Sequence, residues 1–268
     1  MLIGNREFDT ENRCYIMGIL NVTPDSFSDG GKWNTIDSAL RHAENMAADG
    51  ADIIDVGGES TKPGYISISA NEETDRIIPV IEAIRDRLDV PVSADTYKSA
   101  VAEAALSAGA VLVNDIWGLK RDPDMAGVIA RGNAACCLTH NRGDADYTDF
   151  LSDLLSDLRA SAAIAESAGI APGKIILDPG IGFAKTYDMN LMAINRLDLI
   201  GNLGYPVMLG ASRKSVIGIA LGLPADERAE GSLAAAVIGA ARGCSFIRAH
   251  DVKGTKRAIM MAEAILRS

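Results

Sequence analysis

Eight short apolar runs recur along the chain, and almost every one ends in a polar cluster. They occupy residues 15–20, 51–56, 90–94, 110–113, 134–138, 174–177, 206–209 and 244–247. The runs are rich in Val, Ile and Leu without strict alternation, which is typical of parallel strands buried on both faces. Polar residues at the exits of these strands predict chemistry at one end of a sheet.

Helical stretches lie between the runs. They cover residues 36–49, 71–88, 98–108, 125–131, 146–168, 189–200, 226–241 and 252–266. The first two repeat apolar residues at helical spacing, and Ser69 to Glu72 has the form of a capping box. Gly169 ends the longest stretch as a C′ glycine. Strands that alternate with helices predict a parallel sheet with helices outside.

The number of strands predicts an α/β fold, a (β/α)8 TIM barrel forming a single domain over residues 1–268. Such barrels typically have about 250 residues and keep their active sites at one mouth. The main alternative is an open doubly wound sheet. Against it, no G-x-G-x-x-G motif follows the first run, and polar exits occur around the whole set of strands. Residues 2–8, with a turn at Gly4-Asn5, are interpreted as a small extra N-terminal hairpin.

Composition narrows the class of protein. A net charge of −10 argues against a nucleic-acid partner, although a local basic pocket can still bind an anion. The four cysteines have no C-x-x-C spacing, so we interpret them as reduced thiols of a cytoplasmic protein. No signal-peptide pattern and no apolar run near ~18 residues is visible, so no membrane partner is expected. Residues 232–241 are apolar nearly all round, which predicts a subunit interface.

Two predicted loops are longer than their connections require. One runs from Asn21 to about Thr35 and contains Thr-Pro-Asp-Ser-Phe-Ser-Asp, and the other covers residues 57–69. Ordinary βα loops need only about 2–6 residues. Turn-forming residues alone would explain the composition, but long loops at a barrel mouth are typical of lids. Two lids predict a reaction from which water is excluded.

Asp95, Asn114 and Asp178 each end a predicted strand. Any one of them is explained almost as well as a helix N-cap or the start of a turn. Together, carboxylates and an amide suit a flat heterocycle, because carboxylates accept N–H groups while the amide both donates and accepts.

Cationic residues follow the last two strands, as Ser-Arg-Lys-Ser at 212–215 and Arg-Ala-His at 248–250. These loops are the common phosphate site of TIM barrels, so we interpret the cluster as an anion site rather than a solvated patch. His140 and His250 lack the spacing of a zinc site. Any metal is expected to be Mg²⁺, held by one or two oxygens and by substrate phosphates.

Several of these segments resemble the dihydropteroate synthases, and the resemblance covers essentially the whole chain. It is carried by residues 19–31, Asp-Val-Gly-Gly-Glu-Ser-Thr-Lys-Pro-Gly at 55–64, Asn-Asp-Ile at 114–116, Asp-Pro-Gly at 178–180, Ser-Arg-Lys-Ser at 212–215 and Arg-Ala-His-Asp-Val at 248–252. The resemblance implies a homodimeric barrel in folate biosynthesis. It also implies a reaction that joins 4-aminobenzoate to 6-hydroxymethyl-7,8-dihydropterin diphosphate and releases diphosphate.

The resemblance also implies roles for individual residues. The pterin pocket would comprise Asp95, Asn114, Asp178 and Lys214. Diphosphate would be bound by Asn21, Lys62, Arg248 and His250, with Asn21 also at the Mg²⁺ ion. The aminobenzoate would be surrounded by Phe27, Thr61, Pro63, Phe183, Ser212 and Lys214. The catalytic set would be Asp95, Lys214, Arg248 and His250.

The chain departs from the family pattern in three places. Lys62 stands where the second loop usually has Arg, and Thr139 stands where Met usually precedes His140. The family's Phe-Gly-Phe-Gly-Lys segment reads Ile-Gly-Phe-Ala-Lys at 181–185. Arg and Lys differ in hydrogen-bond geometry, so Lys62 together with the polar Thr139 predicts altered sensitivity to sulfonamides, which imitate aminobenzoate.

Two other functions remain as alternatives. A pterin-dependent methyltransferase barrel shares the pterin pocket but should lack the Thr-Pro-Asp-Ser-Phe-Ser-Asp loop and the Ser-Arg-Lys-Ser cluster. A non-catalytic pterin-binding paralogue is suggested only by Lys62, and Asn21, Lys214, Arg248 and His250 argue against it.

Overall fold

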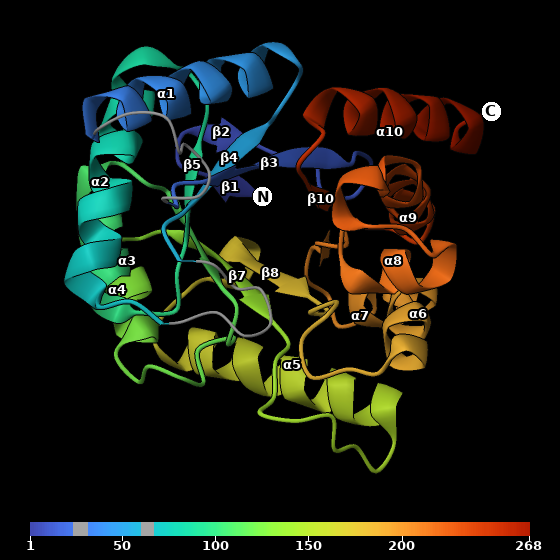
Figure 1. Ribbon diagram of the computed structural model, residues 1–268. Helices are drawn as coiled ribbons and strands as arrows, with labels where there is room; N and C mark the ends of the chain where they lie inside the picture. Colours follow the sequence, from blue (N-terminus) through green and yellow to red (C-terminus); the bar gives the residue numbers. More distant parts are fainter. Residues whose placement is uncertain (24–31, 60–66) are drawn as a thin grey trace.

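A ring of parallel strands forms the centre of the molecule (Figure 1). The structure is a computed structural model that describes residues 1–23, 32–59 and 67–268, with backbone alone for 32–35. The strands are β3 (Tyr15–Asn21), β4 (Ile53–Gly57), β5 (Val92–Asp95), β6 (Leu112–Asp115), β7 (Ala135–Thr139), β8 (Ile175–Asp178), β9 (Met208–Leu209) and β10 (Phe246–Ala249). They pair in the order β8-β7-β6-β5-β4-β3-β10-β9. A parallel bridge between Leu177 and Val207 joins the two ends of this sheet. The predicted barrel is therefore confirmed, and the open doubly wound sheet is wrong.

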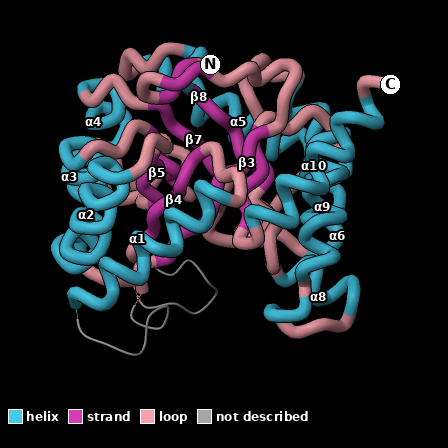
Figure 2. Tube along the Cα trace, turned by 90° about the horizontal axis from the view of Figure 1, so that it is seen from above, coloured by secondary structure: helices cyan, strands magenta, loops and turns pink. Residues whose placement is uncertain are grey.

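Helices surround the strands on the outside (Figure 1, Figure 2). They are α1 (Lys32–Ala48), α2 (Ala70–Arg87), α3 (Ser99–Ala108), α4 (Met125–Arg131), α5 (Phe150–Ser167), α6 (Tyr187–Asn195), α7 (Leu197–Gly201), α8 (Ser215–Leu221), α9 (Ala229–Ala241) and α10 (Val252–Leu266), with short 3-10 turns at Pro172–Lys174 and Ala225–Glu227. Each barrel strand is thus covered by helix on its outer side, as the alternating pattern predicts.

Some helix boundaries differ from those expected. The stretch 189–200 is divided at Arg196 into α6 and α7. The seven-residue α8 was not predicted, because so short a helix shows too few apolar repeats to be recognised. At α5 the start moves from residue 146 to 150, because the Asp149 side chain accepts a hydrogen bond from Ser152 N at 2.8 Å and caps the helix. Gly169 has φ 94° directly after this helix, which confirms its predicted C′ role.

An apolar cluster fills the amino-terminal part of the barrel interior. It consists of Ile3, Phe8, Met17, Ile53, Leu112, Ala135, Cys137, Ile176, Met208 and Phe246. Ile3 and Phe8 come from the predicted N-terminal hairpin, which is confirmed as β1 (Leu2–Ile3) paired antiparallel with β2 (Arg6–Glu7). The Phe8 ring lies 5.7 Å from that of Phe246, centroid to centroid, so the hairpin closes the amino-terminal end of the barrel.

All four cysteines, Cys14, Cys136, Cys137 and Cys244, are buried free thiols. Among the described helices, none is long and apolar enough to cross a membrane.

Candidate active site

The interior of the barrel becomes polar two residues beyond the apolar cluster. Because alternate residues of a strand face the same side, the side chains that follow Ile53, Leu112, Ile176 and Phe246 inside the barrel are polar. The members of this polar layer are Asp55 on β4, Asp95 on β5, Asn114 on β6, Asp178 on β8 and Arg248 on β10. All five stand at or near the carboxyl ends of their strands.

Arg248 joins two carboxylates across the barrel mouth. Its Nε donates to Asp55 Oδ2 at 2.6 Å, and its Nη2 donates to Asp95 Oδ2 at 2.6 Å. Asn114 Nδ2 donates to the same Asp55 oxygen at 3.1 Å. The planar guanidinium therefore fixes the positions of two carboxylates, one on β4 and one on the neighbouring β5, through its N–H donors. Arg248, assigned to diphosphate by resemblance, contacts these two aspartates in this structure.

Sequence reasoning did not assign a role to Asp55. This residue is fully buried, and it orients both Arg248 and Asn114 through one oxygen. The signal was visible, since Asp55 is a charged residue near the end of an otherwise apolar run at 51–56. A carboxylate with both faces of its strand buried requires a partner inside the barrel.

Two buried acceptors in this layer have no hydrogen-bond partner among the described residues. They are Asp55 Oδ1 and Asn114 Oδ1. Most buried polar atoms in proteins are hydrogen-bonded, so such a pair at a barrel mouth indicates a ligand that brings N–H donors. Asn114 belongs to the acceptor trio predicted from the strand ends, and Asp55 lies in the same layer as the other two members, Asp95 and Asp178.

Lys214 lies close to this layer, where its charge interacts with Asp178, Arg248 and Asp95. Its Nζ donates to the Ile181 carbonyl and lies 4.7 Å from the centroid of the Phe183 ring. Asp178 Oδ1 accepts from Gly180 N at 2.6 Å. Burial lowers the pKa of Lys214 to about 8, while the nearby Asp178 opposes that shift. Lys214 therefore needs an anionic neighbour or substrate to remain fully charged.

Asp95 has a raised affinity for protons. Burial raises its pKa to about 7, Arg248 acts in the opposite direction, and the carboxylates of Asp55 and Glu73 add to the rise. Burial also raises the pKa of Asp178, against the effect of Lys214. The Asp95 carboxyl is thus held close to the point where it takes up a proton at neutral pH.

The other predicted residues lie around this centre. Ser212 Oγ lies 3.0 Å from His250 Nδ1 and accepts from His250 N at 3.2 Å, so the loops after β9 and β10 are joined. Asn21 is exposed at the end of β3, paired in register with Gly57. Phe27, Thr61, Lys62 and Pro63 lie outside the described residues.

His140 does not pair with His250 as a metal site. Its Nε2 lies 3.0 Å from Asp157 Oδ2, and its Nδ1 lies 2.9 Å from Lys185 Nζ. Burial and Lys185 lower the pKa of His140 to about 3. Both ring nitrogens thus have protein partners, and the described parts of the chain contain no group of three or more His, Cys, Asp or Glu residues that could hold a metal ion.

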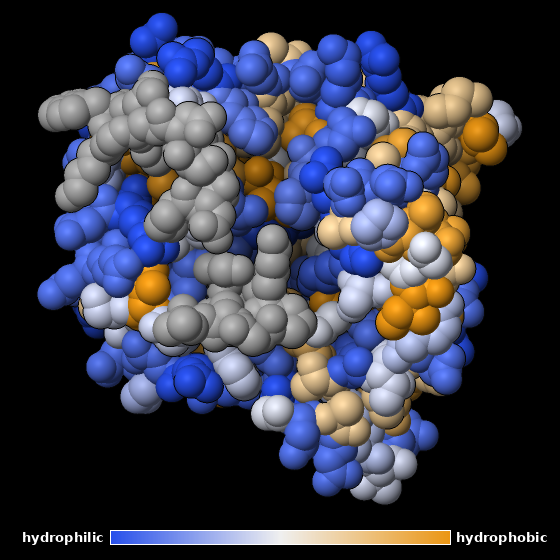
Figure 3. Space-filling view, viewed as in Figure 1, coloured by the Kyte–Doolittle hydropathy of each residue, from blue (hydrophilic) through white to orange (hydrophobic). Residues whose placement is uncertain are grey.

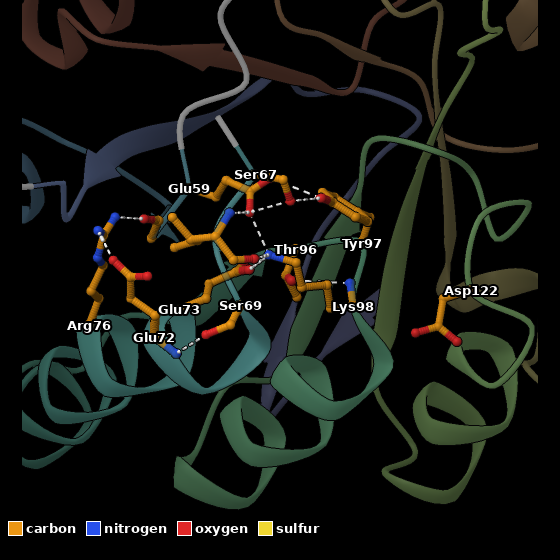
Figure 4. A network of polar contacts seen from close by, with 12 residues as sticks. Glu59, Ser67, Ser69, Glu72, Glu73, Arg76, Thr96, Tyr97, Lys98 and Asp122 are labelled. Atoms are coloured by element: carbon orange, nitrogen blue, oxygen red, sulfur yellow. Dashed lines mark hydrogen bonds and ion pairs between the residues drawn. The ribbon is translucent and has the colours of Figure 1, made fainter. Parts of the chain in front are cut away.

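A buried ion cluster holds the residues on either side of the segment 60–66 (Figure 4). Lys98 Nζ donates to Glu59, to Glu73 Oε2 at 2.6 Å and to the Ile68 carbonyl at 2.8 Å. Tyr97 Oη donates to Glu59 Oε1 at 2.9 Å. The second long loop is therefore anchored at both ends to the residues that follow Asp95.

Comparison with known proteins places this geometry in a family. Residues 17–250 match the family model described as "Pterin binding enzyme". The chain is 56% identical to a dihydropteroate synthase of Clostridium beijerinckii over the full length of both chains. It is 54% identical to that of Bacillus subtilis, covering 96% of this chain and 90% of the relative.

Solved structures agree in shape over the whole chain. A dihydropteroate synthase of Clostridium difficile, crystallised with pteroic acid, superposes with a TM-score of 0.95 at 47% identity, covering 98% of this chain and 100% of the other. A Yersinia pestis dihydropteroate synthase in complex with a sulfonamide drug superposes with a TM-score of 0.94 at 41% identity, covering 100% and 99%. At these identities the likeness extends beyond the fold.

Proposed function

This chain belongs to the dihydropteroate synthase family of pterin-binding enzymes, and on that premise we propose that its barrel mouth is a transferase active site of folate biosynthesis. It condenses 6-hydroxymethyl-7,8-dihydropterin diphosphate with 4-aminobenzoate, giving 7,8-dihydropteroate and diphosphate. The observation that carries this proposal is the pair of partnerless acceptors, Asp55 Oδ1 and Asn114 Oδ1, in a buried acceptor layer beside Lys214. A reduced pterin offers the N–H groups that such a layer lacks.

The pterin ring would lie on Asp95, Asn114, Asp178 and Lys214. Carboxylates accept the ring N–H and amino protons, while the Asn114 amide oxygen accepts and the Lys214 ammonium donates. Asp55 and Arg248 support this pocket, because their ion pair fixes Asp95 and Asn114 before substrate arrives. Preorganised groups of this kind lower the reorganisation needed in the transition state.

The bond changes follow from the substrates. The neutral aniline nitrogen of 4-aminobenzoate attacks the pterin methylene carbon, the carbon–oxygen bond breaks, and the electron pair leaves with diphosphate. The nitrogen then loses one proton to solvent. Positive charge that develops on the dihydropterin is stabilised by the carboxylate of Asp95, and negative charge on the departing diphosphate is stabilised by nearby cations. Catalysis by Asp95, Lys214, Arg248 and His250 is in this sense electrostatic.

Residues at the opening of the barrel would bind the remaining parts of the substrates. We assign the diphosphate to Asn21, Lys62, Arg248 and His250, where Ser212 holds His250 in place. We assign the aminobenzoate to Phe183, Ser212 and Lys214 among the described residues. Phe27, Thr61 and Pro63 remain proposals for the same subsite.

The donor set suits Mg²⁺ rather than a tightly coordinated transition metal. Asn21 offers a single amide oxygen at the end of β3, and no cluster of three ligating residues occurs in the described ranges. Mg²⁺ typically takes few protein oxygens and completes its shell with water and substrate phosphate. Bound there by Asn21, it would neutralise charge on the diphosphate.

A homodimer is proposed from an apolar face formed by α8, α9 and α10. Figure 3 shows apolar side chains gathered over this side of the molecule. The large exposed apolar residues there are Ile219, Leu221, Ile238, Met260, Met261, Ile265 and Leu266. Exposed apolar patches of this kind mark association surfaces. The predicted interface segment 232–241 lies in α9, at the centre of this face.

Four free buried thiols support the proposed cytoplasmic location.

Diphosphate release tests the function directly. The protein is incubated with pterin diphosphate, 4-aminobenzoate and Mg²⁺, and diphosphate and dihydropteroate are measured together. Equal amounts of both are expected. A methyltransferase or a non-catalytic pterin-binding protein would release no diphosphate. The absence of diphosphate release would therefore refute the proposal.

Altered sulfonamide sensitivity is proposed from Lys62 and Thr139. Thr139 is buried at the end of β7, where a hydroxyl replaces an apolar side chain. The double variant Lys62→Arg/Thr139→Met is expected to change the inhibition constant of a sulfonamide while 4-aminobenzoate remains a substrate. An unchanged inhibition constant would exclude this proposal.

A further inference from the structure

The loop that follows β8 is held by side chains rather than by regular structure. Phe183 N donates to Gly180 O at 3.1 Å and closes a turn. Asn190, on α6, accepts from Gly182 N at 2.7 Å through Oδ1, and Tyr147 Oη donates to Ala184 O at 2.9 Å. Backbone groups that lie away from water need such partners. The position of this loop is therefore set by a few polar contacts.

Lys185 supplies the central contact. Its Nζ lies 2.9 Å from His140 Nδ1, 3.0 Å from Gly180 O and 3.0 Å from Phe183 O, with His140 O further away at 3.4 Å. In its protonated form the amine has three N–H donors, and the three short contacts use all of them. Burial lowers the pKa of Lys185 to about 7, and the nearby Asp178 opposes that shift. The two ends of the turn, at 180 and 183, are tied to a single nitrogen.

His140 makes this contact rigid. Because burial keeps its imidazole neutral, Nδ1 accepts from Lys185 while Nε2–H donates to Asp157 Oδ2 at 3.0 Å. Asp157 in turn accepts from Arg142 Nε at 2.7 Å. A chain of hydrogen bonds thus leads from α5, through the end of β7, to Lys185. Each member fixes the orientation of the next.

The loop after β8 packs closely against the residue that follows β7. Gly180 has φ 70°, and a Cβ at this position would lie 1.9 Å from the His140 carbonyl oxygen. The loop therefore lies directly against the end of β7. Its carbonyls at 180 and 183 face the ammonium of Lys185.

The turn in question contacts a residue of the active site. The Ile181 carbonyl accepts from Lys214 Nζ, and the Phe183 ring lies 4.7 Å from the same nitrogen. Both groups belong to the short segment whose ends Lys185 holds. A shift of this turn would move one side of the surroundings of Lys214 as well as the aromatic ring assigned to aminobenzoate.

We propose that Lys185 is a positioning residue of this enzyme, which sets the place of the Ile181 carbonyl and the Phe183 ring against Lys214. The inference deepens the proposed function and rests on it. Lys185 acts through the loop and touches no substrate. Its role is to hold the aminobenzoate side of the site in the geometry that lets the two substrates meet.

The test compares Lys185→Met with Tyr147→Phe. The methionine keeps an unbranched side chain that is one atom shorter and removes all three donors, whereas Tyr147→Phe removes one hydrogen bond to the neighbouring carbonyl of Ala184. Displacement of reacting groups by about 1 Å can change rates on the order of 100-fold. We expect Lys185→Met to raise the KM for 4-aminobenzoate at least about tenfold, with the KM for pterin diphosphate changed far less. Tyr147→Phe removes one contact outside the turn at 180–183, so it should raise the KM for 4-aminobenzoate far less than Lys185→Met does.

Hydrogen exchange gives a readout that does not need activity. In Lys185→Met, amides of residues 180–184 should exchange faster, while amides of the barrel strands keep their wild-type rates. If Lys185→Met does not fold, Lys185→Gln, which retains two N–H donors, should show the same changes to a smaller extent. Unchanged exchange in 180–184, or a loss of kcat and thermal stability with both KM values unchanged, would overturn the proposal. Failure of the wild-type protein to form dihydropteroate would instead refute the proposed function. Hydrogen exchange in residues 180–184 would then still test whether Lys185 positions the loop.

Discussion

Replacing Asp55 by asparagine is expected to change the protonation of Asp95 without touching it. Asp55 and Asp95 bind adjacent nitrogens of one guanidinium, each at 2.6 Å, and the Asp55 charge is one of the causes that raise the pKa of Asp95 to about 7. In Asp55→Asn the side-chain shape is kept and the charge is removed. Arg248 then serves a single carboxylate, so the pKa of Asp95 should fall.

The size of the shift follows from Coulomb's law. Carboxylates on neighbouring guanidinium nitrogens stand on the order of 5 Å apart, and at an effective dielectric constant of about 20 they repel by about 3 kcal/mol. One pKa unit corresponds to about 1.4 kcal/mol, so the full removal of this repulsion is worth about 2 units. Partial screening at the open mouth reduces it, and we expect a fall of about 1–2 units.

The pH dependence of kcat/KM for pterin diphosphate measures this shift, because it reports groups of the free enzyme. The ionised form of Asp95 is the one that stabilises the developing cation. The wild-type rate should therefore rise with pH through about 7, and the same limb in Asp55→Asn should lie about 1–2 pH units lower. The diphosphate of the substrate titrates identically in both experiments. Asp75→Asn, at an exposed position of α2, is the matched control and should not move the limb.

Stability gives a second measure of the same group. In the folded protein the pKa of Asp95 is raised, so between its unfolded value near 4 and about 7 the folded state binds more protons than the unfolded state. Its contribution to stability is complete below pH 4 and is lost as the pH rises to about 7. That loss should be smaller in Asp55→Asn. If neither the kinetic limb nor this slope changes, Asp55 does not set the charge of Asp95, and the reasoning is refuted.

Three further substitutions test the packing and the buried charges. Gly180→Ala is expected to lower the free energy of unfolding by about 3 kcal/mol or more, because its Cβ would lie 1.9 Å from a backbone carbonyl oxygen; a urea midpoint equal to wild type would contradict this. Ala184→Gly is expected to raise that free energy by about 0.5–1 kcal/mol, since relief of the left-handed conformation at φ 43° exceeds the entropy that glycine gains on unfolding; a lower melting temperature would count against it. Lys98→Met is expected to lower the free energy of unfolding by about 3–5 kcal/mol, because Glu59 and Glu73 lose their shared cation. The double variant Lys98→Met/Glu73→Gln should recover part of this loss in urea unfolding. No recovery would argue against the buried charge as the cause.

Register explains why the polar layer forms so tightly at one level of the barrel. Asp95 pairs in register with both Gly57 on one side and Asn114 on the other. A Cβ at position 57 would lie 3.4 Å from Asp95 Cβ, in ordinary van der Waals contact, so the two strands pack closely at this level. The polar layer thus lies at one level of the barrel, and the apolar cluster closes the interior on its amino-terminal side.

The sequence alone determined the class of fold and the edge of the sheet that carries the site. Apolar runs with polar exits predict the barrel, because the carboxyl ends of parallel strands all lie at the same end. Asp95, Asn114 and Asp178 could be found in this way, since Asp95 and Asp178 end their strands and Asn114 stands one residue before the end of its own. The long loops and the cationic residues after the last two strands could be found by the same local reading.

Only the tertiary structure decided which of these side chains touch. Arg248 contacts Asp55 and Asp95, which are 193 and 153 residues away in the chain, and Lys185 contacts His140 at a separation of 45 residues. Such pairs depend on strand register, on the closure of the barrel and on which loop carbonyls are left without solvent. Sequence periodicity records which side of an element is buried, but it contains no distances between elements, and it is those distances that set the charge of Asp95 and the place of Lys214.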